Sequence, residues 1–331
     1  MQSASAPHGN HRHICLPGDG TDFTHWRAVA RALVLEGVAP DSISWSCAYA
    51  QQTAPDLFAP ASAEAVVACD AGAAQGAQAV LCEGISQLTV PRAWMLMAEQ
   101  CLLHASPERF GLLYRLLWRM QHEPGMRRDP LDADQVRMQH MVKAVRREVH
   151  KMHAFVRFRP VDMPDDPVDG TGPLHVAWFE PENFITHAAA PFFVKRFANM
   201  RWAILTPHCT VRWWPAAPNV AALAAQGVDP ECAMQPLRGR PGVLSWGAGA
   251  HASEAPAPDA GEGLWLTYYA HIFNPARLKT AAMRKEMPRR YWRNLPEAQL
   301  ISPLVQAAQA RSAAMLAQAA TQTRRRLPHA K

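Results

Sequence analysis

The sequence predicts an α+β protein with a mainly antiparallel sheet packed with helices, a helical middle segment and an N-terminal strand–helix unit. Apolar side chains recur at helical spacing in residues 134–151. Residues 155–159 alternate between the two faces of a strand, and residues 174–180 form a second strand-like run. Two further runs, 201–205 and 209–214, flank Thr206-Pro207-His208 as in a hairpin. Strands this close together, with helices before and between them, favour an antiparallel sheet covered by helices.

The N-terminal unit consists of a short apolar strand at 14–16 followed by a helix. Asp22 is placed as the N-cap of that helix, and Gly37 occupies the position just past its end. The connecting Gly18-Asp19-Gly20 lacks the third glycine of a dinucleotide loop and the Lys-Ser/Thr of a P-loop. The loop therefore does not indicate nucleotide binding.

The middle segment contains three predicted helices, at 91–104, 106–120 and 134–151, after a loose Ala-, Gln- and Pro-rich connection at 50–80. The third helix has one apolar stripe, formed by Met138, Met141, Val142, Val145, Val149 and Met152. Its opposite face carries Lys143, Arg146, Arg147 and His150. We expect Glu148 to be the one counter-charge among these cations. The alternative is an ordinary amphipathic helix with a solvated polar face.

The C-terminal half adds a predicted helix at 191–199, a partly ordered excursion at 215–260 and an aromatic helix at 264–273. A segment in which three arginines flank two aromatic residues then follows, Arg289, Arg290, Tyr291, Trp292 and Arg293. Arginine pairs with phosphate, and Tyr or Trp stacks on an unpaired base. The alternative is that both aromatic side chains pack in the core while the arginines are solvated.

The 331 residues are enough for two modest domains. We expect a disordered N-terminus at 1–13, an α/β and helical region at 14–130, a core domain at 131–300 and a helical, basic tail at 301–331. No signal peptide and no membrane span is recognisable, so we expect a cytoplasmic protein. The seven cysteines are scattered and never spaced C-x-x-C, which disfavours a disulfide framework, a zinc ribbon and an iron–sulfur cluster.

Positive charge is concentrated near the C-terminus. Residues 277–293 contain seven Arg or Lys and one acid, whereas residues 1–276 carry a net charge of −4. A basic region on an otherwise acidic chain indicates a polyanionic partner. For Arg324, Arg325 and Arg326 alone, a solvated basic tail is the simpler interpretation.

Several segments together resemble one bacterial family of unknown function, labelled as DNA metabolism or DNA repair proteins. They are residues 90–93, 106–119, 143–159, 177–182, 191–197, 202–207 and 272–298. The resemblance implies a DNA-repair setting, with a uracil-DNA glycosylase-like domain and a radical SAM protein as partners. It implies no reaction. We expect two departures from the family: the sequence ends at Lys331 where fused members would continue past Arg311 into a glycosylase domain, and residues 213–247 are longer than the family's short turn and strand.

Three functions remain open. The first is a DNA repair accessory protein that binds nucleic acid, single-stranded or damaged DNA, through Lys143, Arg146, Arg147, Lys151, Arg157, Arg159, Arg196, Arg277, Arg289, Arg290, Tyr291, Trp292 and Arg293. The second is a DNA-processing enzyme, a nuclease or a lesion-processing activity, that uses Glu148, His150, His153 and Glu180. The third is a protein–protein adaptor for a separate glycosylase. We expect no cofactor and no metal, since the His150-x-x-His153 spacing needs a further ligand such as Glu180 or His175.

Overall fold

The computed structural model describes residues 11–49, 88–161 except 124, 127 and 128, 173–215, 235–236, 242–257, and 262–317 except 264, 265, 268, 269, 271–282 and 284. The chain forms two compact units. The first comprises residues 1–153 and 181–193, and the second comprises residues 154–180 and 194–331. The predicted boundary at residue 130 does not coincide with the division between these units, since residues 131–153 and 181–193 both belong to the first unit.

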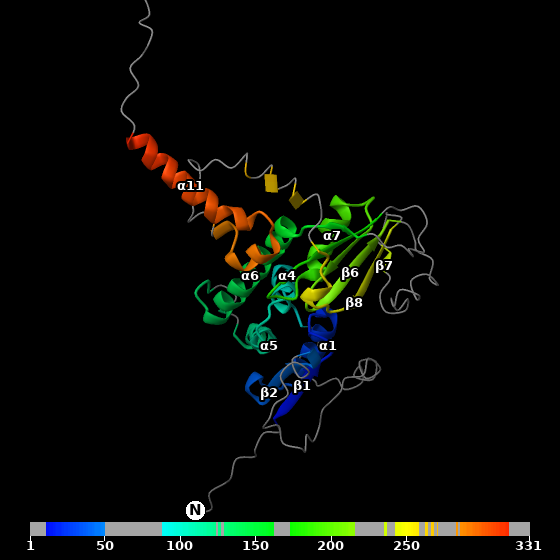
Figure 1. Cartoon of the computed structure of the whole chain (residues 1–331). Helices are drawn as coiled ribbons and strands as arrows, with labels where there is room; N and C mark the ends of the chain where they lie inside the picture. The colour runs from blue at the N-terminus through cyan, green and yellow to red at the C-terminus, as the bar shows by residue number, and fades with distance from the viewer. Residues whose placement is uncertain are drawn as a thin grey trace, which may run out of the picture. The chain divides into compact units, whose positions relative to one another are not determined.

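A strand–helix–strand motif begins the first unit. β1 (Arg12–Leu16) pairs in parallel with β2 (Ile43–Cys47), and α1 (Phe23–Leu35) and the short η1 (Pro40–Ser42) lie between them in the chain (Figure 1). As predicted, Asp22 caps α1, accepting hydrogen bonds from the backbone N–H groups of Thr24 and His25. Gly20 has φ +76° and lies against Phe110, so a Cβ at this position would meet the ring at 2.5 Å. Only glycine fits this turn without strain.

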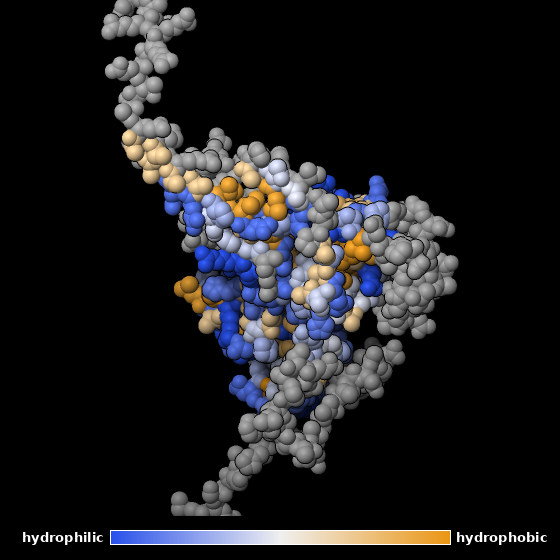
Figure 2. All heavy atoms as spheres, viewed as in Figure 1, coloured by the Kyte–Doolittle hydropathy of each residue, from blue (hydrophilic) through white to orange (hydrophobic). Residues whose placement is uncertain are grey.

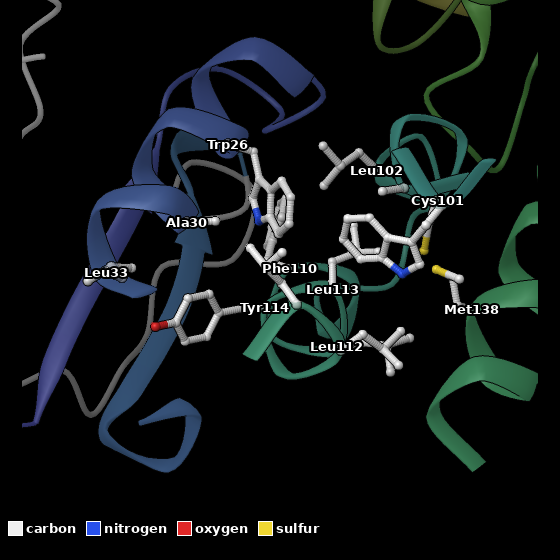
Figure 3. Packing of buried hydrophobic residues seen from close by; sticks show 14 of the residues in the cluster. Trp26, Ala30, Leu33, Cys101, Leu102, Phe110, Leu112, Leu113, Tyr114 and Met138 are labelled. Carbon is white, nitrogen blue, oxygen red and sulfur yellow. The ribbon is translucent and has the colours of Figure 1, made fainter. Parts of the chain in front are cut away.

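Three helices complete the core of the first unit: α4 (Arg92–Leu102), α5 (Glu108–His122) and α6 (Ala133–Phe155). Figure 3 shows Trp26 and Ala30 of α1 facing Phe110, Leu113 and Tyr114 of α5. Tyr114 donates its hydroxyl to the Val38 carbonyl at 2.6 Å, which satisfies the polar tip of a buried ring. The predicted apolar stripe of α6 is confirmed for Met138, Met141, Val142, Val145 and Met152, which are all buried, whereas its sixth member, Val149, is half-buried.

A six-stranded sheet of order β3-β4-β5-β6-β8-β7 forms the second unit. Its strands are β3 (Arg159–Val161), β4 (Leu174–Trp178), β5 (Trp202–Leu205), β6 (Cys209–Trp214), β7 (Gln235–Pro236) and β8 (Val243–Ala248). All neighbouring pairs are antiparallel except β4 and β5, which α7 (Thr186–Arg196) separates in the chain. Strands β6, β8 and β7 lie side by side in Figure 1. The α+β class and the hairpin, with Trp202 opposite Trp213, are confirmed.

Among the described residues, apolar clusters contribute to the stability of this unit. Val176, Ala203 and Leu205 pack together with Ala250, which precedes the short η4 (Ala252–Glu254). The second cluster forms around η6 (Arg289–Asn294) and α11 (Ala298–Ala317), where Leu295, Ala298 and Ile301 are buried against Phe155 and Trp292. The C-terminal segment therefore belongs to the core of the second unit.

Two predicted elements have other bounds. Residues 155–159 are not a strand, because α6 continues to Phe155 and β3 begins only at Arg159. The helix predicted at 191–199 is α7, which begins at Thr186 and contains Pro191. Proline is favoured in the first turn of a helix, and for this reason the predicted helix begins at Pro191, five residues after the observed start.

Strands β2 and β8 were not predicted, although Ile43, Trp45 and Cys47 alternate with two serines. The predicted features at 1–10, 50–80 and most of 215–241 and 264–273 lie outside the described residues. Of the helices described, none combines the length and the apolar character needed to cross a bilayer.

Candidate nucleic-acid interface

The exposed face of α6 is basic. Lys143, Arg146, Arg147 and His150 are exposed, at the helical spacing that the sequence predicts. Lys143 and Arg147 have no carboxylate partner among the described residues, and Arg146 donates to the neutral Gln100 Oε1 at 2.7 Å. Hydrophilic side chains dominate the surface over α5 and α6 in Figure 2. The positive charge of this face is therefore not neutralised locally.

Several other cations of the first unit are paired, whereas Arg27, Arg31 and Arg92 are exposed with no carboxylate partner among the described residues. Arg115 donates to Asp134 at 2.6 Å, and Arg119 contacts Asp132, Asp134 and Glu123. The side-chain hydrogen bond from Arg115 holds the pKa of Asp134 below its usual value. Arg12 pairs with Glu36, and Arg137 pairs with Glu108. The basic face at 143–147 thus differs in charge balance from the surface around these paired arginines.

Glu148 does not lie on the basic face. Its side chain is 2% exposed. Oε1 accepts the Glu182 N–H at 2.9 Å, and Oε2 accepts the Asn183 backbone N–H at 2.8 Å and its Nδ2 at 2.6 Å. The expectation that Glu148 is the counter-charge of this face is wrong, because the residue shares the buried side of α6 with Val145 and Met152.

The segment at 182–184 is fixed by further contacts within the first unit. Asn183 Oδ1 accepts the Ala105 N–H at 2.9 Å, and the Phe184 N–H donates to the Leu103 carbonyl at 2.9 Å. Glu148 therefore joins α6 to the turn between α4 and α5 through Asn183. Both carboxylate oxygens are engaged in these hydrogen bonds, so Glu148 holds the segment at 182–183 against α6.

A buried arginine lies near this turn. Arg109 is 1% exposed, donates to the carbonyls of Ala105, Ser106 and Asp19, and places its guanidinium 4.1 Å from the Phe110 ring centre. Burial lowers the pKa of Arg109 from its usual value. Burial also lowers the pKa of His104, and the charge of Arg109 acts in the same direction. These groups hold the turn together.

Each of the other candidate catalytic residues has surroundings within its own unit. His150 is exposed, whereas His153 stacks on Phe192, with ring centres 4.0 Å apart. Burial lowers the pKa of His153, which favours the neutral imidazole. Glu180 accepts from Trp178 Nε1 at 3.0 Å. Within the described residues, no three His, Cys, Asp or Glu side chains gather as metal ligands, and His175 lies on β4.

The two arginines before and in β3 are neutralised. Arg157 reaches Glu297 at 3.3 Å and the Ala154 carbonyl at 2.8 Å. Arg159 donates to Glu262 and to the Pro256 carbonyl, both at 2.6 Å. Each cation already has an acidic partner, so neither adds an uncompensated charge to a phosphate-binding surface.

The aromatic–arginine segment divides into buried and accessible residues. Tyr291 is 2% exposed, with Phe179 stacked on its ring at 5.3 Å and the Arg290 guanidinium at 4.8 Å. These contacts leave no ring face for a base, which corrects the expectation for Tyr291. Trp292 is half-buried, and Arg289 and Arg290 are exposed.

Of the remaining predicted cations, Arg196 is exposed on α7 and Lys151 is half-buried on α6. Arg277 and the side chain of Arg293 lie outside the described residues. Two polar residues of importance were not predicted, Asn183 and Asn294. Neither has a local sequence signal, since the partners of Asn183 are 35 and 78 positions away in the chain.

The fold and this surface define an α+β protein with a basic helix face that no carboxylate of the described residues neutralises. Residues 107–297, more than half of the chain, match the model of a domain of unknown function, DUF4130. The chain therefore belongs to the DUF4130 family. No curated protein and no solved structure matches it. The match begins beside α5 and ends just before α11, so it includes the basic face of α6.

Proposed function

We propose that this protein binds nucleic acid through the exposed face of α6, as an accessory protein of a DNA repair system. One observation carries the proposal: Lys143, Arg146 and Arg147 are exposed with no acidic partner in the part of the chain that the structure describes, while the adjacent acid, Glu148, is turned into the core. A row of unpaired cations is the electrostatic footprint that a phosphate backbone requires.

The spacing of these cations suits a linear polyanion. Residues 143 and 147 are one helical turn apart, which is about 6 Å along the axis at 1.5 Å per residue. Two cations one turn apart can contact phosphates of one strand. Contacts of this kind depend on charge and not on sequence, so we expect binding without base preference at this face.

The repair setting belongs to this proposal and rests on the family resemblance. In that setting the substrate is single-stranded or damaged DNA, and the partners are a uracil-DNA glycosylase-like protein and a radical SAM protein. An adaptor that binds the glycosylase-like protein without contacting DNA is the competing account. It predicts co-purification that persists after nuclease treatment.

The test is fluorescence anisotropy with a labelled single-stranded oligonucleotide at 50–300 mM salt. Neutralising three phosphates predicts a log–log slope of about −2, from about −0.7 per phosphate on single strands. The double variant Lys143→Gln, Arg147→Gln should bind more weakly, with a slope shallower by about 1.4.

The matched control is Arg12→Gln, Arg137→Gln, which removes the same charge from two exposed arginines that lie beside Glu36 and Glu108. We expect it to bind with the slope of the unaltered protein. Arg137 lies on α6 but outside the face at 143–147. Equal losses of affinity in the two double variants would therefore attribute binding to net charge and overturn the assignment to that face.

A further inference from the structure

A sizeable cavity lies in the second unit, around η6. It has a volume of about 610 Å³, and Arg159, Glu262, Trp292, Asn294, Leu295 and Gln299 contribute to its wall. This volume falls within the range of roughly 300–1,000 Å³ that is usual for small-ligand sites. Two smaller hollows share its lining residues. Trp292 also lines one of about 160 Å³, and Arg159 and Asn294 also line one of about 90 Å³.

Trp292 forms a fixed aromatic wall of this cavity. Its Nε1 donates to the Met287 carbonyl at 2.9 Å, and the Arg289 guanidinium lies 5.8 Å from its ring centre. The indole is half-buried and borders two cavities, in contrast to the buried ring of Tyr291 beside it. An aromatic ring held in one orientation and bordered by open volume suits stacking with a planar ligand.

Polar groups with unused hydrogen-bonding capacity lie beside this wall. The Nδ2 of Asn294 is buried, and no acceptor reaches it in the described part of the chain. Arg159 is held by Glu262 and the Pro256 carbonyl, which orients its remaining N–H donors. Gln299 adds an exposed amide. Amide and guanidinium groups beside an aromatic wall match the carbonyl and ring-nitrogen acceptors on the edge of a nucleobase.

We infer that this cavity receives an unpaired nucleobase, which stacks on Trp292 and places its edge against Asn294 and Arg159. The inference rests on the proposed nucleic-acid binding and extends it from phosphate to base. It requires single-strand preference, because a paired base is stacked within its duplex and its edge is occupied. The same base could come from a strand or from a free nucleotide.

The test compares the affinities of a 12-nucleotide single strand and the corresponding duplex in the full chain. Trp292→Leu should weaken single-strand binding by at least about fivefold, the lower end of the loss expected when a base loses an aromatic partner, and change duplex binding by less than about twofold. Trp292→Phe should keep most of the affinity, because a flat ring remains. Asn294→Ala should also reduce single-strand affinity.

Trp118→Leu is the matched control. Trp118 is a half-buried tryptophan of the first unit that stacks on His122. We expect this variant to keep the ratio of single-strand to duplex affinity, and thermal unfolding of every variant verifies that it folds. Equal losses on single strand and duplex in Trp292→Leu, or no loss in either, would overturn the inference.

Two further arms separate the source of the base and the two proposals. If deoxythymidine monophosphate displaces the single strand from the unaltered protein but not from Trp292→Leu, the ligand of the cavity is a free nucleotide. If the protein prefers the single strand and the nucleotide does not displace it, the ligand is a base of the strand. Lys143→Gln, Arg147→Gln should weaken single strand and duplex alike and keep their ratio. If that variant binds normally while Trp292→Leu loses the preference, the α6 interface fails and the base site stands. If the double variant binds weakly while Trp292→Leu keeps the single-strand preference, only the base site is overturned.

Discussion

Replacing Glu148 by alanine should destabilise the first unit by about 3–5 kcal/mol. The carboxylate accepts three hydrogen bonds from Glu182 and Asn183 at 2.6–2.9 Å while only 2% exposed. A hydrogen bond to a charged group contributes about 1.5–3 kcal/mol, and a buried donor left unpaired costs about 1–3 kcal/mol. The simple sum is an upper bound, because water enters the truncated site. The melting temperature should fall by about 10 °C for a unit of this size.

The assay is urea unfolding followed by circular dichroism, with Glu148→Gln and Glu123→Ala beside Glu148→Ala. Glu148→Gln should lose about half as much stability as Glu148→Ala, because its amide NH₂ faces a backbone N–H. Glu123 is 53% exposed and pairs with Arg119 one turn away, so Glu123→Ala should cost less than about 0.5 kcal/mol.

The refuting result is a Glu148→Gln protein as stable as the unaltered one. If that variant also lost a DNA-processing activity, Glu148 would be the catalytic carboxylate of the alternative hypothesis and not a positioning residue. Stability and activity measured on one preparation therefore decide between the two roles.

Three further predictions follow from particular contacts. Because the pKa of Asp134 is lowered beside Arg115, its ionised form stabilises the fold at neutral pH. The loss of unfolding free energy in Asp134→Asn should therefore shrink as the pH falls below about 4 in acid-unfolding curves. A loss of stability that does not change with pH would contradict this. Burial raises the pKa of the Cys101 thiol to about 12, so a thiol reagent at pH 8 should modify Cys15 and Cys209 well before Cys101 in the native protein, as peptide mapping will verify. Gly20→Ala should lower the free energy of unfolding by at least about 2 kcal/mol, because its Cβ meets Phe110. Gly18 also has a positive φ but faces open space, so Gly18→Ala should lower it by about 1 kcal/mol. Equal losses of stability in chemical denaturation would rule out the contact with Phe110.

The sequence was sufficient for elements whose pattern is local. The stripe from Met138 to Met152 predicted α6, and Asp22 and Gly37 predicted the bounds of α1. The hairpin was predicted because the turn at Thr206-Pro207-His208 lies between two apolar runs. Each of these signals is contained within one element.

Glu148 illustrates what a local pattern does not provide. Helical counting places it between Val145 and Met152 on the buried side, but a carboxylate is rarely buried unless it is paired. Its partners are 34 and 35 residues away, in a segment with no helix or strand of its own. Similarly, the carboxylates that neutralise Arg157 and Arg159 are 140 and 103 residues distant in the chain. Such pairings depend on tertiary structure, which single-sequence patterns do not specify.

The return of residues 181–193 to the first unit determines how the chain can be divided. A fragment ending at residue 153 would retain Glu148 but lose both of its partners. A fragment beginning at residue 154 would include residues 181–193, which pack in the first unit and would have no core to join. No single cut yields either unit intact. Dissection by truncation is therefore unsuitable for this protein, and point variants in the uncut polypeptide are the appropriate tool.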